Sequence, residues 1–377
     1  MSKPLPFDHP VHIARPLLPP LELYIETIRS IWRSRQITNN GYRHNALEEM
    51  LCRYLRAQHL SLTCNGTMAL LLACRALELS GEVITTPFTF AAAANALSWC
   101  GVTPVFADID PVTMTIDSSA VERAITPRTT GLLPVHIFGI ACDVPRLQEI
   151  ASRHDLRVLY DGAHAFGTEI AGEPIVNFGD ATVLSFHATK TFHTAEGGAI
   201  AATNRALKDR IDQLRNFGIE NEDSVVLPGI NGKLNELQAA LGLTNLQLVD
   251  AEPRAQTELT NIYGSRIKEM AGFTVATQPH AGANYHSFVV RIDRNQAGIS
   301  RDDIYERLKT FNVFTRRYFR NLCSEFPFFR HLPSSRAENL PVAHRVAQEV
   351  LCLPLYSVLG ADGANRICDM IKFIITK

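Results

Sequence analysis

The sequence lacks several features that would point to particular classes of protein. It has no CxxC pair, and its eight cysteines are scattered through apolar runs such as "ALLLACRAL". This pattern predicts reduced core residues rather than a zinc site or a disulfide framework. No apolar run approaches the ~20 residues of a membrane-spanning helix, and the N-terminus lacks the apolar core of a secretory signal. We therefore expect a soluble, cytoplasmic protein without a membrane partner.

The sequence also lacks an excess of either charge. Its 377 residues include 37 Lys and Arg against 38 Asp and Glu, which gives a formal net charge of −1. This balance provides no general attraction to nucleic acid or to an anionic membrane, so any phosphate group must be bound locally. With 46% hydrophobic and 20% charged residues, the chain is expected to be globular and long enough for two domains.

What the sequence does contain is an alternation of helical and strand-like patterns. Helical spacing occurs at residues 45–57 and 66–79, and short β-branched or aromatic runs occur at residues 82–86, 103–109, 131–139, 157–163 and 181–187. This α/β alternation predicts a mainly parallel sheet with helices on both faces. We assign it to a large domain, residues 1–254, that includes the N-terminal segment.

The pattern changes after a break between long helices near Pro253. A strand is expected at residues 285–293, a helix at residues 300–311 with Ser300 as its N-cap, and a closing helix at residues 360–377. These elements predict a smaller C-terminal α+β domain, residues 255–377. No internal repeat occurs, which argues against a solenoid.

Four polar residues lie just beyond predicted strands, namely Asp161, His164, Ser185 and Lys190. In parallel sheets, ligands bind at the carboxyl ends of the strands. A shared pocket is therefore expected from the order of the elements alone.

The turn "CNGTM" precedes a predicted helix. Gly66 and Thr67 would offer backbone N–H groups and a hydroxyl at the positive end of the helix dipole, which suits a phosphate. A simple N-cap explains the same residues without a ligand, and the motif taken alone favours that interpretation.

Lys190 lies in the loop "SFHATKTFHTAEGGAI". Lysines are mostly surface residues, and Asp161 or His164 could be a helix cap or a structural group. In a dry pocket, however, a lysine with a lowered pKa can form a Schiff base, and a buried Asp161 could keep a pyridine nitrogen protonated. Gly197 and Gly198 would permit close backbone approach of a flat ring.

Taken together, these motifs resemble the DegT/DnrJ/EryC1/StrS sugar aminotransferases over nearly the whole chain. The resemblance rests on "NGTMALLLACRAL", "EVITTPFTFAAAANALSWCGVTPVFADID", "PVHIFG", "VLYDGAHAFG", "SFHATKTFHTAEGGAIAAT", "LRNFG" and "GINGKLNELQAALG". It implies the aspartate aminotransferase fold (fold type I) and pyridoxal 5′-phosphate (PLP) as the cofactor.

The resemblance also implies a role for each matching residue. Lys190 would be the catalytic Schiff-base lysine, Asp161 would pair with the pyridine nitrogen, and His164 would bind the phenolic oxygen of the ring. Phe90 would stack on the ring. The phosphate would be held by Gly66, Thr67 and Ser185, together with Asn231 of a neighbouring subunit, so a homodimer with shared active sites is implied.

The implied reaction moves an amino group from L-glutamate to a ketone on a nucleotide-linked sugar. The loop "HATKTFHTAEGGA" is more similar to relatives acting at C4 than to those acting at C3. We therefore expect dTDP-4-dehydro-6-deoxyglucose to give the 4-amino-4,6-dideoxy sugar, in a pathway toward lipopolysaccharide O-antigen or a glycosylated metabolite. Arg316, Arg317 and Tyr318 are candidates for substrate binding, although a solvated basic turn explains them as well.

Several alternatives remain at this point. The substrate could be a C3-keto sugar, or one linked to UDP or GDP. A dehydratase of the same fold would carry histidine in place of Lys190, and a desulfurase-like enzyme would need a cysteine in a mobile loop. A non-catalytic sensor of PLP or nucleotide sugar would keep the fold without the reaction.

Overall fold

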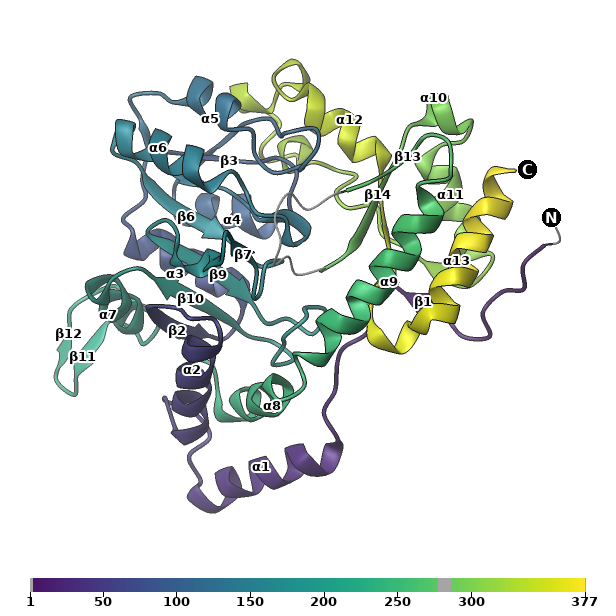
Figure 1. The fold of residues 1–377 in the computed structure, drawn as a ribbon. Helices are drawn as coiled ribbons and strands as arrows, with labels where there is room; N and C mark the ends of the chain where they lie inside the picture. Colours follow the sequence, from purple (N-terminus) through teal and green to yellow (C-terminus); the bar gives the residue numbers. More distant parts are fainter. Residues whose placement is uncertain (1–2, 277–285, 377) are drawn as a thin grey trace.

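The computed structural model describes residues 3–276 and 286–376 and has a seven-stranded sheet at its centre (Figure 1). Only one strand in the interior of the sheet pairs antiparallel to both neighbours, and the remaining pairs are parallel. The mainly parallel sheet expected from the sequence is confirmed. From edge to edge the strands are β2 (His59–Thr63), β10 (Gly198–Ala202), β9 (Ala181–Ser185), β6 (Arg157–Asp161), β5 (Thr129–Leu133), β3 (Glu82–Thr85) and β4 (Thr103–Phe106).

Three strand assignments differ from the sequence patterns. Strands β2 and β10 were not expected, and β10 consists of Gly, Ala and one Ile, which have little in common with strong β-formers. The run 131–139 was predicted as strand throughout, but β5 ends at Leu133 because Pro134 has no N–H for the ladder. The run continues as a short 3₁₀ turn, Ile137–Gly139.

Helices cover both faces of the sheet, as expected. Alternate strand residues point to opposite sides, so apolar side chains on each face need a layer of helices to cover them. Val183 of β9 lies in the core on one face and Leu184 in the core on the other. The first face is covered by α3 (Gly66–Ala76), α4 (Ala92–Trp99), α7 (Arg205–Leu214) and α12 (Pro341–Glu349). The second is covered by α2 (Tyr42–Tyr54), α5 (Ser118–Ala124), α6 (Val144–His154) and α8 (Glu236–Leu246).

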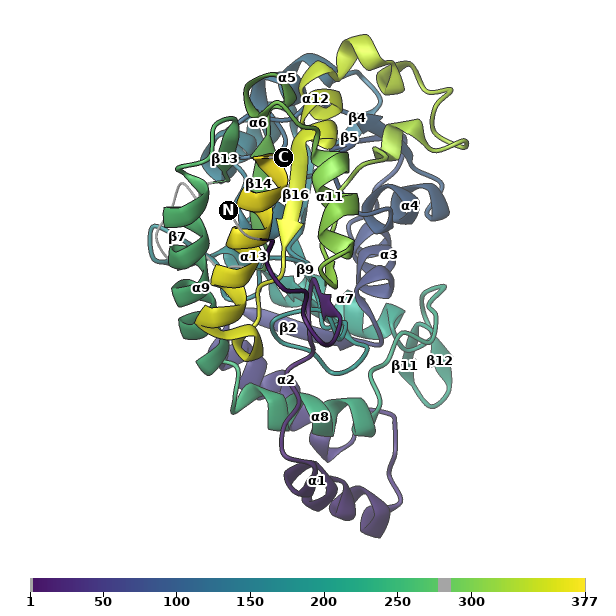
Figure 2. The same cartoon turned by 90° about the vertical axis from the view of Figure 1, so that its right-hand side faces the viewer.

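A second, three-stranded antiparallel sheet has its own core. Figure 2 shows its helices alongside β14 and β16. Ser300 accepts a hydrogen bond from Asp303 N–H and caps α11, as expected, whereas Tyr285, at the start of the predicted strand, lies outside the described residues. The elements are β13 (Phe273–Val275), β14 (Phe288–Ile292), β16 (Val350–Leu353), α9 (Ala251–Ile267), α11 (Arg301–Lys309) and α13 (Gly360–Ile375).

The proposed division into residues 1–254 and 255–377 stays a prediction. Helix α9 runs across that boundary. The N-terminal strand β1 (Val11–His12) pairs in parallel with β15 (Val313–Phe314), and Val11 packs into the same core as α9 and α13. His193, on the other side of the proposed boundary, binds the Leu17 carbonyl oxygen at 2.7 Å. The N-terminal segment before residue 21 therefore contacts residues of both proposed domains.

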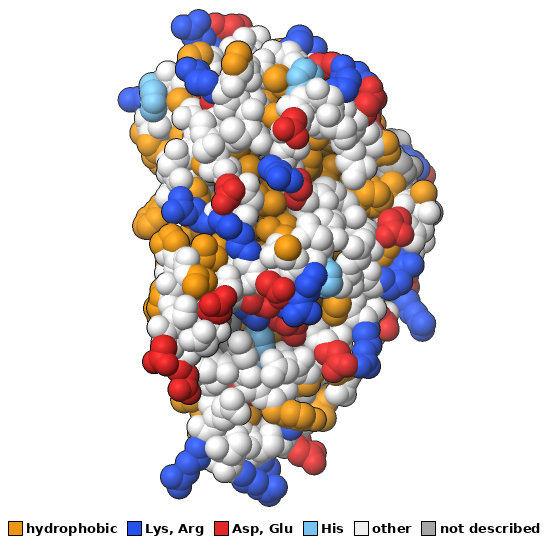
Figure 3. Space-filling view, turned by 90° about the vertical axis from the view of Figure 1, so that its left-hand side faces the viewer, with side chains coloured by type: hydrophobic (Ala, Val, Ile, Leu, Met, Phe, Trp, Pro, Cys, Tyr) orange, Lys and Arg blue, Asp and Glu red, His pale blue; other side chains and the backbone are white. Residues whose placement is uncertain are grey.

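Helix α1 (Leu21–Ser34) extends below the sheet in both ribbon views and packs against α8. No described helix is both long enough and apolar enough to cross a membrane. On the face shown in Figure 3, acidic and basic side chains are intermixed. The remaining short elements are β7 (Glu169–Ile170), β8 (Glu173–Pro174), β11 (Ile219–Asn221), β12 (Ser224–Val225), α10 (Arg294–Ala297) and 3₁₀ turns at 175–177, 323–325, 333–335, 337–339 and 357–359.

Candidate active site

A cavity of about 650 Å³ lies at the carboxyl ends of β6 and β9. These neighbouring strands are parallel, with Asp161 opposite Val183, so their last residues emerge at the same edge. Of the eight residues expected at the site, seven line this cavity: Gly66, Thr67, Phe90, Asp161, His164, Ser185 and Lys190. Asn231 does not line it and is exposed to solvent.

The start of α3 forms one end of the cavity. Asn65 caps the helix by accepting a hydrogen bond from Met68 N–H at 2.8 Å, so the capping interpretation holds. The turn is also pressed against the strand ends, since a Cβ on Gly66 would lie 2.9 Å from Ser185 Cβ. Backbone amides, the positive helix end and the Ser185 hydroxyl thus meet at one place, which fits a phosphate group.

Gly198 serves a different contact from the one expected. A Cβ on Gly198 would come within 2.7 Å of the Asn65 carbonyl carbon. The glycine therefore lets β10 pass directly beneath the turn that precedes α3, which is a contact within the chain rather than with a ring. This close contact fixes the position of the Gly66 turn relative to the sheet.

Asp161 is the buried acid of the cavity, with 5% of its surface exposed. Its Oδ1 accepts a hydrogen bond from Ala163 N–H at 2.9 Å. Burial raises the pKa of Asp161, while the Ala163 N–H and the Lys190 charge oppose the rise. A carboxylate held in these surroundings is stabilised by a cationic partner, such as a protonated pyridine nitrogen.

Lys190 projects from a loop that is fixed at both ends. Phe186 and Phe192 are fully buried and meet edge to face at 4.9 Å, and Lys190 N–H donates to the His187 carbonyl at 2.8 Å. Burial lowers the pKa of Lys190 to about 8, and Asp161 works against this change. At pH 7 about a tenth of such amines are neutral and nucleophilic, far more than for a solvated lysine.

His164 is held as a neutral donor. The Phe138 backbone N–H donates to His164 Nδ1 at 3.3 Å, so the ring proton lies on Nε2. Burial lowers the pKa of His164 well below its usual value, with further contributions from Lys190 and His286. An uncharged Nε2–H suits an anionic oxygen such as the phenolate of PLP.

The structure separates the basic turn into two parts. Arg316 and Tyr318 line the cavity. Arg317 does not; it pairs with Asp302 at 2.9 Å and lies 4.0 Å above the Tyr305 ring. A solvated basic turn therefore does not describe Arg317, whose side chain is only 19% exposed, and Arg316 and Tyr318 remain the candidates for substrate binding.

His286 lines the cavity and was missed by the sequence reasoning. It comes just before β14, and its ring stacks on His164 at 4.2 Å between centroids. The only local signal was a histidine at the start of a predicted strand. Its partner lies more than 100 positions earlier in the chain, so periodicity could not reveal the contact.

The residues of the cavity fit PLP, with a phosphate end at Gly66 and Ser185, an acid for the ring nitrogen and an amine of lowered pKa. Residues 22–372 match the model of the DegT/DnrJ/EryC1/StrS aminotransferase family. The chain belongs to this family and is a PLP-dependent aminotransferase.

Individual relatives narrow the comparison. The dTDP-4-amino-4,6-dideoxy-D-glucose transaminase of Shigella dysenteriae is 39% identical, over 97% of this chain and all of the relative. The solved structure of DesI in the presence of its TDP-sugar product superposes with a TM-score of 0.94 at 36% identity, covering 99% and 95% of the two chains. NtdA from Bacillus subtilis with bound cofactor PMP has a TM-score of 0.87 at 27% identity, covering 95% and 82%.

Proposed function

We propose that this aminotransferase moves an amino group from L-glutamate to the C4 ketone of a nucleotide-linked 4-keto-6-deoxy sugar. The proposed substrate is dTDP-4-dehydro-6-deoxy-D-glucose and the product is dTDP-4-amino-4,6-dideoxyglucose. The convergence of Lys190, Asp161 and the start of α3 on one cavity carries the reaction class. The full-length similarity to the Shigella transaminase supports the substrate.

Each residue of the cavity has a proposed task in holding the cofactor. The amides of Gly66 and Thr67 and the Ser185 hydroxyl bind the phosphate. The Asp161 carboxylate keeps a proton on the ring nitrogen, and His164 Nε2–H donates to the phenolic oxygen. Phe90, which is 63% exposed at the cavity, offers its ring for stacking.

Bound PLP supplies an electron sink for carbanion chemistry. Lys190 Nζ acts as the base that removes the proton from the α-carbon of the donor amino acid. In the second half of the reaction the same Nζ delivers a proton to C4 of the sugar. The carboxylate of Asp161 stays ionised throughout, because its task is to stabilise positive charge beside it.

The proposal includes a homodimer in which Asn231 of one subunit completes the site of the other. Asn231 is exposed and lies outside its own cavity, and the nearby Phe217 and Ile230 are 49% and 40% exposed. A polar residue among exposed apolar side chains suits a subunit interface. A cytoplasmic location is also part of the proposal and is supported by eight unpaired cysteines.

Mixing two impaired variants tests the shared site. Lys190→Ala and Asn231→Ala chains are refolded or coexpressed together in equal amounts. Random pairing puts one intact site in every mixed dimer, so activity should rise toward about a quarter of the wild type. Activity that equals only the sum of the two parents would mean that Asn231 does not act across subunits.

The substrate is tested by NMR of the product. Purified protein is incubated with PLP, L-glutamate and dTDP-4-dehydro-6-deoxyglucose. An amino group at C4 supports the proposal in full. If glutamate converts the bound cofactor to its amine form but no sugar product forms, the aminotransferase chemistry stands and the proposed sugar is wrong.

A further inference from the structure

Two of the histidines that line the cavity, His164 and His286, lie next to different sheets. His164 follows β6 of the seven-stranded sheet, and His286 precedes β14 of the three-stranded sheet. Their rings are stacked at 4.2 Å between centroids, with an angle of 18° between planes. This contact therefore ties the second sheet directly to the chemistry of the first.

The geometry limits the motion of His164. Its Nδ1 is occupied by the Phe138 N–H at 3.3 Å, and the Phe138 ring lies nearly parallel to it at 6.2 Å. One hydrogen bond leaves the imidazole able to pivot about the Nδ1 contact. A second ring lying flat against His164 restricts that pivot and fixes the direction of Nε2–H.

The surroundings also favour two uncharged rings. Burial lowers the pKa of His286 well below its usual value, and the Lys190 charge lowers it further. Stacked neutral imidazoles attract each other without the repulsion that a second cation beside Lys190 would cause.

We propose that His286 is a positioning residue whose ring, stacked on His164, holds His164 Nε2–H toward the phenolic oxygen of the cofactor. The inference rests on the proposed function, in which His164 donates that hydrogen bond. It adds a residue of the second sheet to the machinery that orients the cofactor. A phenylalanine can replace the stacking ring, whereas alanine cannot.

Equilibrium binding of PLP to the apoprotein tests this role without turnover. His286→Ala should weaken PLP binding about fivefold, and His286→Phe should restore affinity to within about twofold of the wild type, since ring stacking rather than a polar contact is lost. The exposed His331, changed to Ala, provides a matched control and should leave affinity unchanged.

A double-mutant cycle then asks whether His286 acts through His164. In a His164→Ala background, the further change of His286 to Ala should have no additional effect on PLP affinity. Equal effects in both backgrounds would overturn the proposal, as would an equal loss in the Ala and Phe variants, because each would indicate a direct contact of the imidazole.

¹⁵N NMR of histidine-labelled apoprotein separates this inference from the proposed function. The His164 signals should show a single Nε2–H tautomer in the wild type and in His286→Phe, and averaged signals in His286→Ala. Unchanged His164 signals in His286→Ala would overturn the inference. If His164→Ala alone leaves PLP affinity unchanged while His286→Ala still mobilises His164, the positioning contact stands and the role of His164 in cofactor binding is wrong.

Discussion

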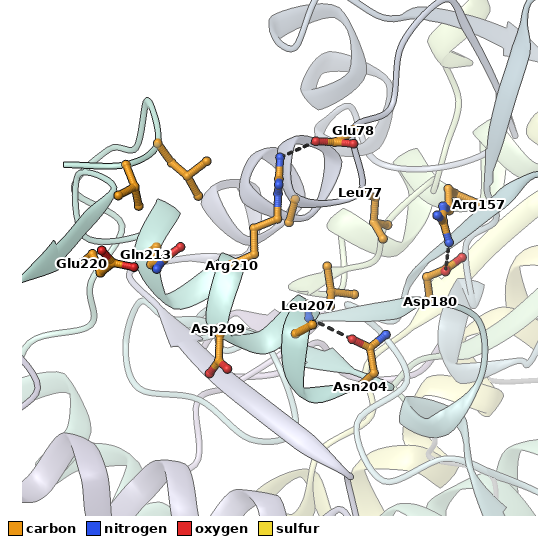
Figure 4. Close-up of a pocket in the computed structure, with 14 residues that line it drawn as sticks. Leu77, Glu78, Arg157, Asp180, Asn204, Leu207, Asp209, Arg210, Gln213 and Glu220 are labelled. Carbon is orange, nitrogen blue, oxygen red and sulfur yellow. Dashed lines mark hydrogen bonds and ion pairs between the residues drawn. The ribbon is translucent and has the colours of Figure 1, made fainter. Parts of the chain in front are cut away.

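The same two strands, β6 and β9, border two hollows of nearly equal size. At their carboxyl ends lies the cavity of about 650 Å³ that holds Asp161 and Lys190, and at their amino ends lies another of about 630 Å³. Figure 4 shows that both arginines of the second hollow are already paired, Arg157 with Asp180 and Arg210 with Glu78. Volume alone therefore does not distinguish them; the buried groups with altered pKa values do.

The two hollows differ in how far their charged side chains are exposed to water. The Arg157 side chain is 63% exposed and remains in contact with water, so it gains little from its partner and offers little to a ligand. Asp161 is buried and has one described hydrogen bond from a backbone N–H. Burial of the Asp161 charge is costly even with the Lys190 charge nearby, and a cationic cofactor group can relieve that cost.

Substitutions in the two hollows should differ most in their effect on amino transfer, and the largest effect is expected for Lys190→Ala in the first hollow. Loss of the amine removes both the nucleophile and the proton carrier, so amino transfer should fall by about a thousandfold or more. Stopped-flow measurement of each half-reaction checks this. Turnover at more than a tenth of the wild-type rate would show that another group performs the chemistry.

Asp161→Asn should have the next largest effect. The side chain keeps its shape but loses the charge that holds a proton on the ring nitrogen, and kcat should fall about a hundredfold. Asp161→Glu, which keeps the charge, serves as the matched control and should retain more activity. Equal kcat for Asp161→Asn and the wild type would remove Asp161 from the assigned role.

The pKa of Lys190 gives a prediction for the stability of the apoprotein. Because burial lowers the folded-state pKa from 10.5 to about 8, the folded chain binds fewer protons than the unfolded chain between those pH values. Stability contributed by this site therefore rises with pH across that window. Lys190→Met removes the cost, so at pH 7 the variant should be more stable by up to about 3 kcal/mol.

Urea unfolding of both apoproteins from pH 7 to pH 10.5 measures this effect. The advantage of Lys190→Met should be complete below pH 8 and should shrink as the pH rises toward 10.5. Titrating groups that Lys190 does not influence cancel in the difference, whereas Asp161, His164 and His286 lose the effect of the Lys190 charge in the variant. A difference that stays constant with pH would mean that the lysine is not desolvated in the folded protein.

The contrast between the hollows also explains how much the sequence could predict. Each polar residue at the end of β6 and β9 directly follows a recognisable apolar run, and parallel strands bring such ends together. The start of α3 is indicated by a local motif, which consists of Asn65, Gly66 and Thr67. The fold class and seven cavity residues therefore followed from local patterns and the resemblance they supported.

What the sequence could not reveal depends on contacts between distant segments. The run of Gly198 to Ala202 becomes an interior strand because β2 and β9 flank it, although its composition has low strand propensity. His286 reaches the cavity only because the second sheet packs against the first. In the second hollow, likewise, no local motif predicts that residues 157, 180 and 210 lie close together.

The smallest expected effect comes from removing either arginine of the second hollow. Arg157→Ala and Arg210→Ala each break an ion pair at the surface, and each should lower the free energy of unfolding by no more than about 1 kcal/mol. The Asp180 carboxylate keeps its hydrogen bond from Val158 N–H at 2.8 Å, which limits the loss for Arg157→Ala. Kinetic constants for both half-reactions should stay within about twofold of the wild type, because neither side chain reaches the cavity of Lys190. A selective loss of sugar amination in either variant would show that the two ends of β6 and β9 are coupled, and the distinction drawn from buried charge would then be incomplete.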